Sequence, residues 1–304
     1  MALTYDDITS ITQKTYIPVM VDNIFNSNAG LHRAKKKWYK AQNGGTSIMQ
    51  PLLYAQNNQA ERLTSSSITT TSNSKKTAAE YDWTRYHAPV VIDGLDTIKN
   101  SGDSAILSNV KTEIQVAEKS LADILGTDIF ADGSTSGSVK GFKLATAATG
   151  TLGGIAKASY SWWQGQVDST TTAISLSTMQ ALFGDCTIDS DRPSVIFTTQ
   201  DIYDDIYSLI QPAQRFGDSD TIKAGFTSIL WNGIPVVVDS HVSSGYLYMI
   251  NEDYVNLIYS KGRDFKLSPF QQPTNQDASI AGVWWAGAMC YSNCRMLGVM
   301  TSIA

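Results

Sequence analysis

A carboxylate and an imidazole lie two positions apart at Asp239 and His241, directly after the apolar run IPVVV (234–238). An aspartate that orients a histidine is the pair that activates a nucleophile in many hydrolases. The chain contains no G-x-S-x-G sequence, which is the usual setting of the nucleophilic serine in α/β hydrolases. An isolated D-x-H is more often a turn with a surface histidine, and we predict no catalytic residue here.

Two acidic pairs and one glycine cluster also resemble parts of ligand sites. Asp189-x-Asp191 and Asp218-x-Asp220 look like fragments of calcium loops, but neither continues into the glycine and distal glutamate of an EF-hand. The glycines of GTLGG (150–154) lack the following Lys-Ser/Thr of a phosphate-binding loop. We interpret the two acidic pairs as turns and the glycine signal as weak, and we predict no metal and no cofactor.

The three cysteines, Cys186, Cys290 and Cys294, do not form a disulfide framework. In an extended chain, Cys290 and Cys294 would be ~13 Å apart along the strand, which is too far for a disulfide. No C-x-x-C occurs and the three histidines are distant in sequence, so a metal site lacks ligands. We predict buried free thiols.

A local basic segment, HRAKKKWYK (32–40), stands out in a chain of net charge −5. Trp38 and Tyr39 could stack on bases, and the neighbouring cations could meet phosphate. The alternative is a solvated helical face. Because the whole chain is acidic, any contact with nucleic acid is expected to be weak and independent of sequence. The candidate genome-facing residues are Arg33, Lys35, Lys36, Lys37 and Lys40.

A long hairpin is predicted around the polar stretch TSSSITTTSNSKK (64–76). The segments on either side, 45–55 and 78–94, alternate apolar and polar side chains as half-buried strands do. Both arms carry large apolar side chains that are costly to expose, so we predict that the hairpin lies on another subunit. These are Leu52, Tyr54, Trp83 and Tyr86.

The clearest helix is predicted over residues 104–125, with Asp103 or Ser104 as N-cap and Gly126 at its end. Its apolar stripe is Ile106, Val110, Ile114, Ala117, Leu121 and Ile124. A shorter helix is predicted within 15–30, where Asn and Gly residues suggest a C-cap.

An α/β section follows a Gly- and Ser-rich region at 132–165. We predict a helix at 174–184, a buried strand at 192–199, a helix at 200–212 that stops at Pro212, and a hairpin turn at Asn232-Gly233. Strands are predicted in 245–260 and from Ser279 onward.

Neither a signal peptide nor a membrane span is recognisable in the sequence. The start MALTYDD is acidic where a signal peptide is basic, and the apolar run AGVWWAGAMC (281–290) has about half the length that a membrane span needs. We therefore predict a soluble, initially cytoplasmic chain.

Five stretches, in this order, resemble the major capsid protein of tailed double-stranded DNA bacteriophages with the Hong Kong 97 fold. They are TYIPVMVDNIF (15–25), GGTSIMQPLLYA (44–55), YDWTRYHAPVVIDGLDTIKNSG (81–102), GFTSILWNGIPVVVD (225–239) with GYLYMIN (245–251), and WWAGAMCYSNCRMLGVMTSI (284–303). The resemblance covers most of the chain. It implies an α+β fold with an N-arm, an extended β-hairpin loop, a peripheral domain with a spine helix, and an α/β axial domain.

The resemblance also implies domain limits and sites. The N-arm would be 1–42, the extended loop 43–90, the peripheral domain 91–145 plus 276–304 with spine helix 104–125, and the axial domain 146–275. The intersubunit loop tip would comprise Thr64, Ser65, Ile68, Asn73, Lys75 and Lys76. The turn at the capsomer centre would comprise Gln211, Arg215, Asp218 and Asp220.

The implied function is a non-enzymatic subunit of an icosahedral viral capsid, in which pentamers and hexamers of the chain enclose the double-stranded DNA genome. The implied partners are other copies of the chain, a separate scaffolding protein, the portal, and DNA through weak contacts, with no membrane. The implied location is the virion capsid, and the host cytoplasm during assembly. The alternatives are an encapsulin-like shell with an enzyme cargo, a β-rich hydrolase that uses Asp239 or Asp189, and a viral tail or decoration protein. The long loop argues against the encapsulin.

Overall fold

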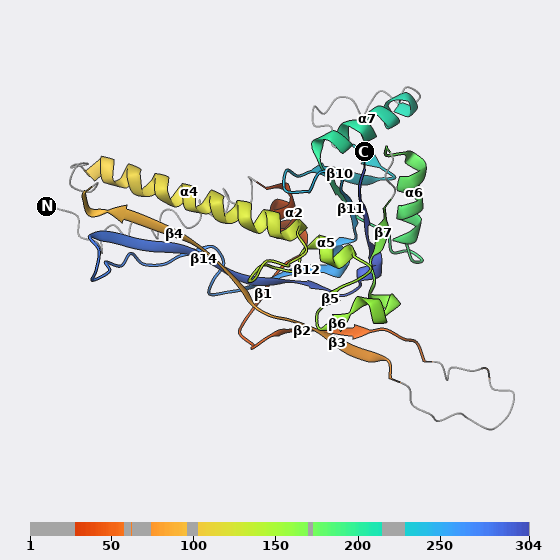
Figure 1. Cartoon of the computed structure of the whole chain (residues 1–304), viewed down its shortest axis with the longest axis horizontal. Coiled ribbons are helices and arrows are strands. Elements are labelled where there is room, and N and C mark those ends of the chain that lie inside the picture. Colours follow the sequence, from red (N-terminus) through yellow and green to blue (C-terminus); the bar gives the residue numbers. More distant parts are fainter. Residues whose placement is uncertain are drawn as a thin grey trace.

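The computed structural model describes residues 28–57, 62, 74–95, 103–169, 173–214 and 229–303, with side chains described from Val110 in the long helix and up to Ile210 in the last one. Helix α4 (Asp103–Phe130) lies along two long strands and forms an elongated arm (Figure 1). A second block at the other end holds helices α6 (Leu176–Asp185) and α7 (Gln200–Gln214). A strand pair, β2 (Ile48–Leu53) and β3 (Lys76–Tyr81), projects from the body between them.

The arm is built on a five-stranded sheet whose centre is the fourteen-residue strand β14. Its strands are β1 (Tyr39–Gln42), β4 (Thr84–Asp93), β12 (Val255–Ser260), β13 (Lys266–Leu267) and β14 (Ala278–Tyr291). Strand β4 pairs antiparallel with β14 from Ala278↔Asp93 to Gly287↔Thr84. Strand β12 pairs with the other end of β14, and β1 runs parallel to β12. The C-terminal segment thus returns to the first half of the chain, as predicted.

The second block is built on a six-stranded sheet of order β7-β15-β11-β8-β10-β9. Its strands are β7 (Gln166–Asp168), β8 (Val195–Thr198), β9 (Leu230–Trp231), β10 (Ile234–Val238), β11 (Leu247–Ile250) and β15 (Leu297–Met300). Strands β8 and β11 are buried at every position, because both faces of the sheet are covered. Phe197 and Tyr248 face the main core, whereas Ile196 and Met249 face a smaller core.

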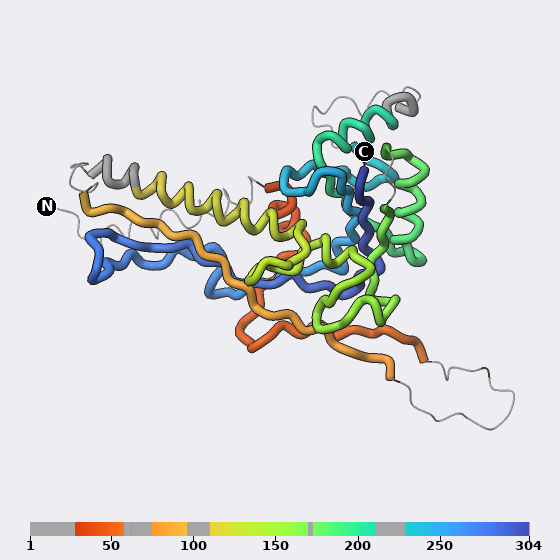
Figure 2. Tube along the Cα trace, in the orientation of Figure 1, coloured from red at the N-terminus to blue at the C-terminus, as the bar shows by residue number. Residues whose placement is uncertain are grey.

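Short elements connect the two sheets, and Figure 2 traces the chain through them. They are α2 (Ala29–Lys37), α5 (Phe142–Thr146), β5 (Thr151–Leu152), β6 (Ile155–Ala156), and the 3-10 turns η1 (Lys157–Ser159), η2 (Ser161–Trp163), η4 (Glu252–Tyr254) and η5 (Cys294–Met296). The ring of Phe130, at the end of α4, lies 5.5 Å from Phe197 and 5.7 Å from Phe142. This aromatic cluster joins the arm to the six-stranded block within one hydrophobic core.

Helix α4 confirms the predicted spine helix but is longer, because it continues through Gly126 to Phe130. Val110, Ile114, Ala117 and Leu121 are buried as predicted. The prediction for Ile124 is wrong, since this side chain is 50% exposed, and the buried stripe continues through Leu125 and Ile129. Ile106 and the side chains of the predicted N-caps lie outside the described residues.

The predicted helix within 15–30 can be tested only at its last residues, because 15–27 lie outside the described part. Asn28 and Gly30 do not end a helix. Asn28 is the N-cap of α2, where its side chain accepts a hydrogen bond from the Leu31 amide at 3.0 Å, and Gly30 lies inside α2. Asparagine occurs before helices and, less often, after them, so the sequence pattern was ambiguous.

The α/β predictions are confirmed with two corrections. Asn232 and Gly233 both have positive φ, at 52° and 77°, as the predicted hairpin turn requires. Helix α7 continues two residues past Pro212 to Gln214, so its predicted stop is wrong. The strands predicted in 245–260 are present, but β11 joins the six-stranded sheet and β12 joins the five-stranded sheet.

Gly141 occupies a position that we expect to tolerate no side chain. A Cβ atom there would lie 2.3–2.6 Å from the backbone oxygens of Asp128, Ile129 and Ala131, at the end of α4. We expect Gly141→Ala to lower the free energy of unfolding by about 1–3 kcal/mol, because backbone must move. The matched control is Gly184→Ala in α6, where a Cβ meets nothing within 4 Å. It should stabilise by about 0.5–1 kcal/mol. Urea denaturation of both variants tests this, and equal effects would contradict it.

Candidate functional site

The projecting hairpin β2–β3 is held to the body through one of its two faces. Its register runs from Ile48↔Tyr81 to Leu53↔Lys76. The inner face carries the buried side chains Ile48, Leu52, Ala79 and Tyr81. The Tyr81 hydroxyl donates to the Tyr291 carbonyl and accepts from its amide, at 3.2 and 3.1 Å. The hairpin is therefore rigidly attached at its base.

The β5–β6 turn adds a second attachment. The Glu80 amide donates to the Gly153 carbonyl at 3.0 Å, and a Cβ atom on Gly153 would lie 2.6 Å from the Ala79 Cβ. Gly153 therefore permits the close approach, and Gly153 and Gly154, both with positive φ, form the turn between β5 and β6.

The outer face of the hairpin leaves apolar side chains uncovered. Met49 and Leu53 are 64% and 73% exposed, and Pro51 between them is also exposed. Glu80 lies opposite Met49, and Lys76 lies opposite Leu53. Strand alternation places these three apolar residues on one side of a two-stranded sheet, and no layer formed by the described residues covers that side. We name Met49, Pro51 and Leu53 the outer face.

The aromatic and apolar side chains predicted to need another subunit are satisfied within the chain, so that argument is wrong. Leu52 and Tyr86 are buried, and the Tyr86 hydroxyl donates to Asp128 at 2.6 Å. Tyr54 stacks on Trp162 at 5.2 Å, and Trp83 donates its indole hydrogen to the Gly45 carbonyl at 3.0 Å. The outer face was not predicted, although the alternation of side chains along 45–55 contains the signal for it.

The second hairpin arm is also shorter than predicted. Strand β3 ends at Tyr81, and β4 begins at Thr84 and pairs with β14 rather than with β2. Of the predicted loop-tip residues, Thr64, Ser65, Ile68 and Asn73 lie outside the described residues. Lys75 and Lys76 lie where the described ladder ends: the Lys75 carbonyl accepts from the Tyr54 amide at 3.1 Å.

The basic segment forms helix α2 and strand β1. Base stacking by its aromatic residues is contradicted, because Trp38 is 2% exposed and packs on Phe142, and Tyr39 stacks on Tyr259 while its hydroxyl bonds Asp264. Lys35, Lys36, Lys37 and Lys40 lie on the exposed side.

Arg33, in contrast, is already paired. Its Nε and Nη2 donate to the two Glu252 carboxylate oxygens at 2.7 and 2.8 Å. The Glu252 side chain is only 4% exposed, and Ser194 Oγ donates to the same carboxylate at 3.0 Å. The ion pair joins α2 to η4, so the Arg33 charge is used inside the subunit.

Asp239 and His241 lie in a turn, as predicted, because the Val242 amide donates to the Asp239 carbonyl at 3.3 Å. The prediction of a surface histidine is wrong, since the His241 side chain is 11% exposed and forms a junction with two helices. Asp239 Oδ1 lies 2.8 Å from His241 Nδ1, and Asp123 Oδ1 of α4 lies 3.0 Å from His241 Nε2. The Gly30 amide of α2 donates to Asp239 Oδ2 at 2.7 Å. Among the described residues, the hydrogen-bond partners of His241 are Asp239, Asp123 and Asn28, and none offers a hydroxyl or thiol nucleophile. The contact of Asp123 with His241 could not be predicted from the sequence, since the two residues are 118 positions apart.

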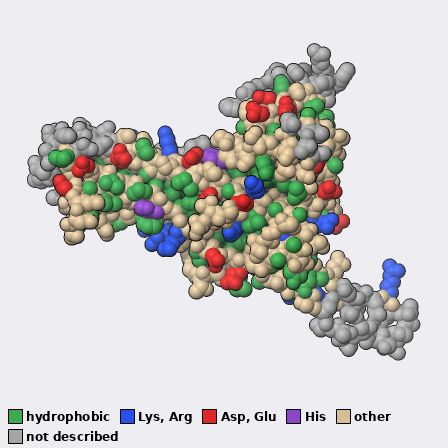
Figure 3. Space-filling view, in the orientation of Figure 1, with side chains coloured by type: hydrophobic (Ala, Val, Ile, Leu, Met, Phe, Trp, Pro, Cys, Tyr) green, Lys and Arg blue, Asp and Glu red, His purple; other side chains and the backbone are tan. Residues whose placement is uncertain are grey.

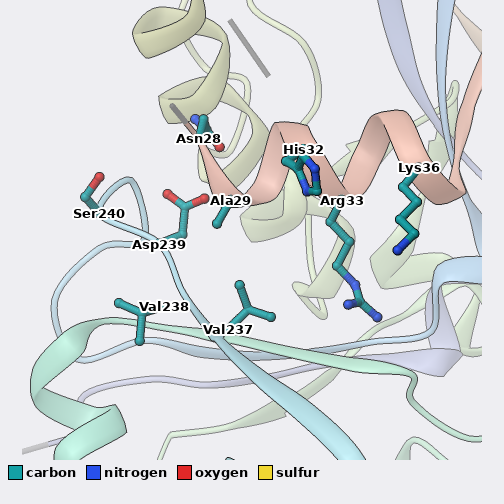
Figure 4. Close-up of a pocket in the computed structure, with 9 residues that line it drawn as sticks. All are labelled: Asn28, Ala29, His32, Arg33, Lys36, Val237, Val238, Asp239 and Ser240. Atoms are coloured by element: carbon teal, nitrogen blue, oxygen red, sulfur yellow. The ribbon is translucent and has the colours of Figure 1, made fainter. Parts of the chain in front are cut away.

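A cavity of about 590 Å³ opens beside this junction between α2 and the end of β10. Figure 4 shows His32, Arg33 and Lys36 on the helix side, with Val237, Val238 and Asp239 opposite. Cations on one wall and a carboxylate on the other make this a polar cavity without an apolar floor large enough for a hydrophobic ligand.

The Asp189–Asp191 turn and the buried cysteines are present as predicted. Asp189, at φ 53°, and Asp191 lie in a turn closed by the Ile188–Asp191 bridge. The three cysteines are free and buried, and burial raises the pKa of each thiol to about 12. Within the described residues, no group of three His, Cys, Asp or Glu side chains could hold a metal ion.

Of the residues predicted at the capsomer centre, Gln211 belongs to the last turn of α7, and Arg215, Asp218 and Asp220 lie outside the described residues. Acidic side chains gather over α7 in Figure 3, where Asp201, Asp204 and Asp205 are exposed.

No helix in the described part of the chain is both long and apolar enough to cross a bilayer.

Burial raises the pKa of Glu118, on the buried side of α4, to about 7. A carboxyl group whose pKa is raised in the fold binds a proton more readily there than in the unfolded chain. The free energy of unfolding should therefore fall as pH rises from about 4.5 to about 7, and Glu118→Gln should flatten this slope. Urea denaturation at several pH values measures it. Glu113→Gln on the same helix is the control, and an unchanged slope in Glu118→Gln would contradict the prediction.

The structure is similar to those of solved capsid proteins. The capsid asymmetric unit of cyanophage A-1(L) superposes with a TM-score of 0.63 at 16% identity, over 90% of this chain and 92% of that one. The capsid of an empty GTA particle gives 0.62 at 11% identity, over 90% and 96%. The chain has the Hong Kong 97 capsid fold.

The Hong Kong 97 fold confirms the predicted α+β class and the resemblance on which it rested. The same fold occurs in the holo-SrpI encapsulin complex of Synechococcus elongatus, with a TM-score of 0.60 at 9% identity, over 90% of this chain and 87% of that one. No protein-family model and no curated protein matches the sequence. The likeness therefore lies in three-dimensional structure.

Proposed function

We propose that the chain is a non-enzymatic structural subunit of an icosahedral capsid, and that its pentamers and hexamers enclose a double-stranded DNA genome. The observation that carries this proposal is the Hong Kong 97 fold over about nine tenths of the chain, combined with a rigidly based hairpin whose outer face is apolar. A monomeric protein gains nothing from an uncovered apolar sheet face, whereas a shell subunit can bury it against a neighbour.

The proposed parts are the N-arm at 1–42, the extended loop at 43–90, the peripheral domain at 91–145 plus 276–304, and the axial domain at 146–275. Each sheet contains a strand from the other proposed domain. Strand β12, within the axial limits, belongs to the five-stranded sheet, and β15, within the peripheral limits, belongs to the six-stranded sheet. Two domains that exchange strands share one core, and we expect them to move as one body within each subunit.

The hairpin would act as the intersubunit clasp. Its base is fixed by Tyr81 and Gly153, so the strands leave the body in one direction (Figure 1). Met49 and Leu53 would bury against a second copy of the chain. The predicted tip residues Thr64, Ser65, Ile68, Asn73, Lys75 and Lys76 would extend this contact, and backbone pairing can stabilise such a mostly polar strand.

Contact with packaged DNA would be weak and independent of sequence. The exposed cations of the basic segment are Lys35, Lys36, Lys37 and Lys40, whereas Arg33 pairs with Glu252. Four cations in a chain of net charge −5 support neutralisation of a few phosphates only. A scaffolding protein and a portal are the further proposed partners. The proposed location is the virion, after assembly in the host cytoplasm, with Gln211, Arg215, Asp218 and Asp220 near the capsomer centre.

A second candidate is an encapsulin-like shell around an enzyme cargo, which the likeness to the SrpI encapsulin complex favours. The two functions require the same contacts between subunits and differ in what the shell contains. A phage capsid would contain nuclease-protected DNA after packaging, whereas an encapsulin would contain protein.

Sedimentation of the full-length chain, expressed alone and with its genomic neighbours, tests the proposal. We expect a fast-sedimenting fraction that shows closed shells or five- and six-membered rings in negative-stain electron microscopy. Shells that protect DNA from nuclease support the capsid, and shells with co-purifying protein support the encapsulin. A chain that remains monomeric at high concentration in every co-expression would overturn both.

A further inference from the structure

Side chains from three elements meet at the imidazole ring of His241, namely the end of β10, helix α4 and the N-cap of α2. Asp239 at the end of β10 lies 2.8 Å from Nδ1, and Asp123 of α4 lies 3.0 Å from Nε2. The His241 side chain is 11% exposed and the Asp239 side chain 1%, whereas the Asp123 side chain is 76% exposed. The ring therefore joins a fixed, buried carboxylate to one that can move into solvent.

Asp239 is held in place independently of the ring. Its Oδ2 accepts the Gly30 amide at 2.7 Å, and its Oδ1 accepts the backbone amide of His241 at 3.0 Å. Two glycines allow this approach. A Cβ on Gly30 would lie 3.1 Å from Asp239 Oδ2, and a Cβ on Gly126 would lie 1.9 Å from Asn28 Nδ2. Gly126 thus stays inside α4 because the N-cap of α2 packs against it.

The two carboxylates constrain the protonation state of the ring. A carboxylate only accepts hydrogen bonds, and a neutral imidazole has a single N–H. Whichever nitrogen carries that hydrogen, the other directs a lone pair at a carboxylate oxygen within 3.0 Å. Asn28 Nδ2, at 3.1 Å from Nδ1, can donate to a neutral ring, but Asp239 would still face the same lone pair. Only the imidazolium satisfies both carboxylates.

Among the described residues that line the neighbouring cavity, the other titratable side chains come from α2. His32, Arg33 and Lys36 lie beside Asp239 (Figure 4), and Arg33 is engaged by Glu252. The proton equilibrium is therefore governed mainly by Asp239 and Asp123.

We propose that His241 is a proton-controlled latch: the protonated ring bridges Asp239 to Asp123, and loss of one proton releases Asp123 while Asp239 keeps the ring. The hydrogen bond with Asp239 raises the pKa of His241, with further contributions from Asp123 against the opposing effect of burial. A histidine whose pKa is raised in the fold stabilises it fully below about pH 6.5, and this contribution is lost as pH rises through the raised value. The latch links the 240–246 loop to α4, and it is a property of the single subunit that stands apart from shell assembly.

Hydrogen–deuterium exchange of the full-length chain between pH 6 and 9, corrected for intrinsic exchange, tests the latch. We expect protection of the 240–246 loop to fall about two- to fivefold with rising pH, because Asp123 is largely exposed and its contact is modest. Asp123→Asn should remove this pH dependence, since an amide can accept from the protonated ring and donate to the neutral one. The controls Asp201→Asn on α7 and His32→Gln on α2 should behave as the unmodified chain.

A loop whose protection does not change with pH, or one whose change survives Asp123→Asn, would overturn the latch. A second measurement avoids substitution altogether. Nitrogen-15 NMR of labelled histidines should show His241 deprotonating at Nε2 and keeping its hydrogen on Nδ1, against Asp239. Deprotonation at Nδ1 instead would contradict the proposal.

Discussion

Replacing Arg33 with methionine is expected to lower the free energy of unfolding of the subunit by about 3–5 kcal/mol. The arginine forms a bidentate pair at 2.7 and 2.8 Å with Glu252, whose side chain is 4% exposed. Without the guanidinium, the hydroxyl of Ser194 is the remaining hydrogen-bond partner of the carboxylate among the described residues. Removing the cation from a buried ion pair lowers stability by far more than the intact pair adds to it, because the desolvation penalty of the carboxylate is no longer offset.

Urea denaturation of the monomeric subunit measures this cost. Lys36→Met, one turn along the same helix on the exposed side, is the matched control and should stay within about 0.5 kcal/mol of the unmodified chain. The double variant Arg33→Met, Glu252→Leu removes both charges and should recover part of the loss. If Arg33→Met and Lys36→Met were equally mild, the arginine would be a surface charge available to nucleic acid, and its structural assignment would be wrong.

The second large effect concerns assembly. The double variant Met49→Lys, Leu53→Glu makes the outer face polar, and each new charge lies opposite a residue of unlike charge, Glu80 or Lys76. Subunit stability should therefore change by no more than about 1 kcal/mol. If both side chains are buried against a neighbour, their replacement removes about 1.5–3 kcal/mol each, which weakens every intersubunit contact by at least about a hundredfold. We expect soluble, folded subunits and no shells.

The control for this variant keeps the apolar character of the face. Met49→Leu with Leu53→Met exchanges the two side chains, and shells should form at close to the normal yield. Sedimentation velocity reports the shell fraction, and circular dichroism reports folding. Normal assembly of the charged variant would show that the outer face is not an intersubunit contact.

Much of the fold was predictable because its signals are local. The Asn232-Gly233 turn needs only two residues that accept positive φ, and the stripe from Val110 to Leu121 needs only helical periodicity. These signals are written within a few residues, and the structure confirms them.

The errors arose where a distant segment decides a local conformation. Gly126 is typical of a helix end, yet it lies inside α4 because Asn28 occupies the space of a side chain. Alternation continues from β3 into β4, but β4 pairs with a strand about two hundred residues away, so the hairpin arm was predicted too long. Tyr86 was predicted to need a partner subunit because neither Asp128 nor β14 could be placed beside it from sequence.

The candidate site follows the same rule. The outer face is visible in the alternation of residues 48–53 once the register is known, whereas the junction of Asp123 with His241 joins residues 118 positions apart and leaves no pattern. The sequence argued against catalysis at Asp239 and His241 because it contains no G-x-S-x-G, and only the structure showed that the histidine bridges two carboxylates.

Cryo-electron microscopy of the fast-sedimenting fraction tests the central claim most directly. The account predicts a closed shell of five- and six-subunit capsomers in which Met49 and Leu53 are covered by a neighbouring copy of the chain. Particles whose subunits meet without the hairpin, or a fraction that contains only irregular aggregates of a monomeric chain, would contradict it.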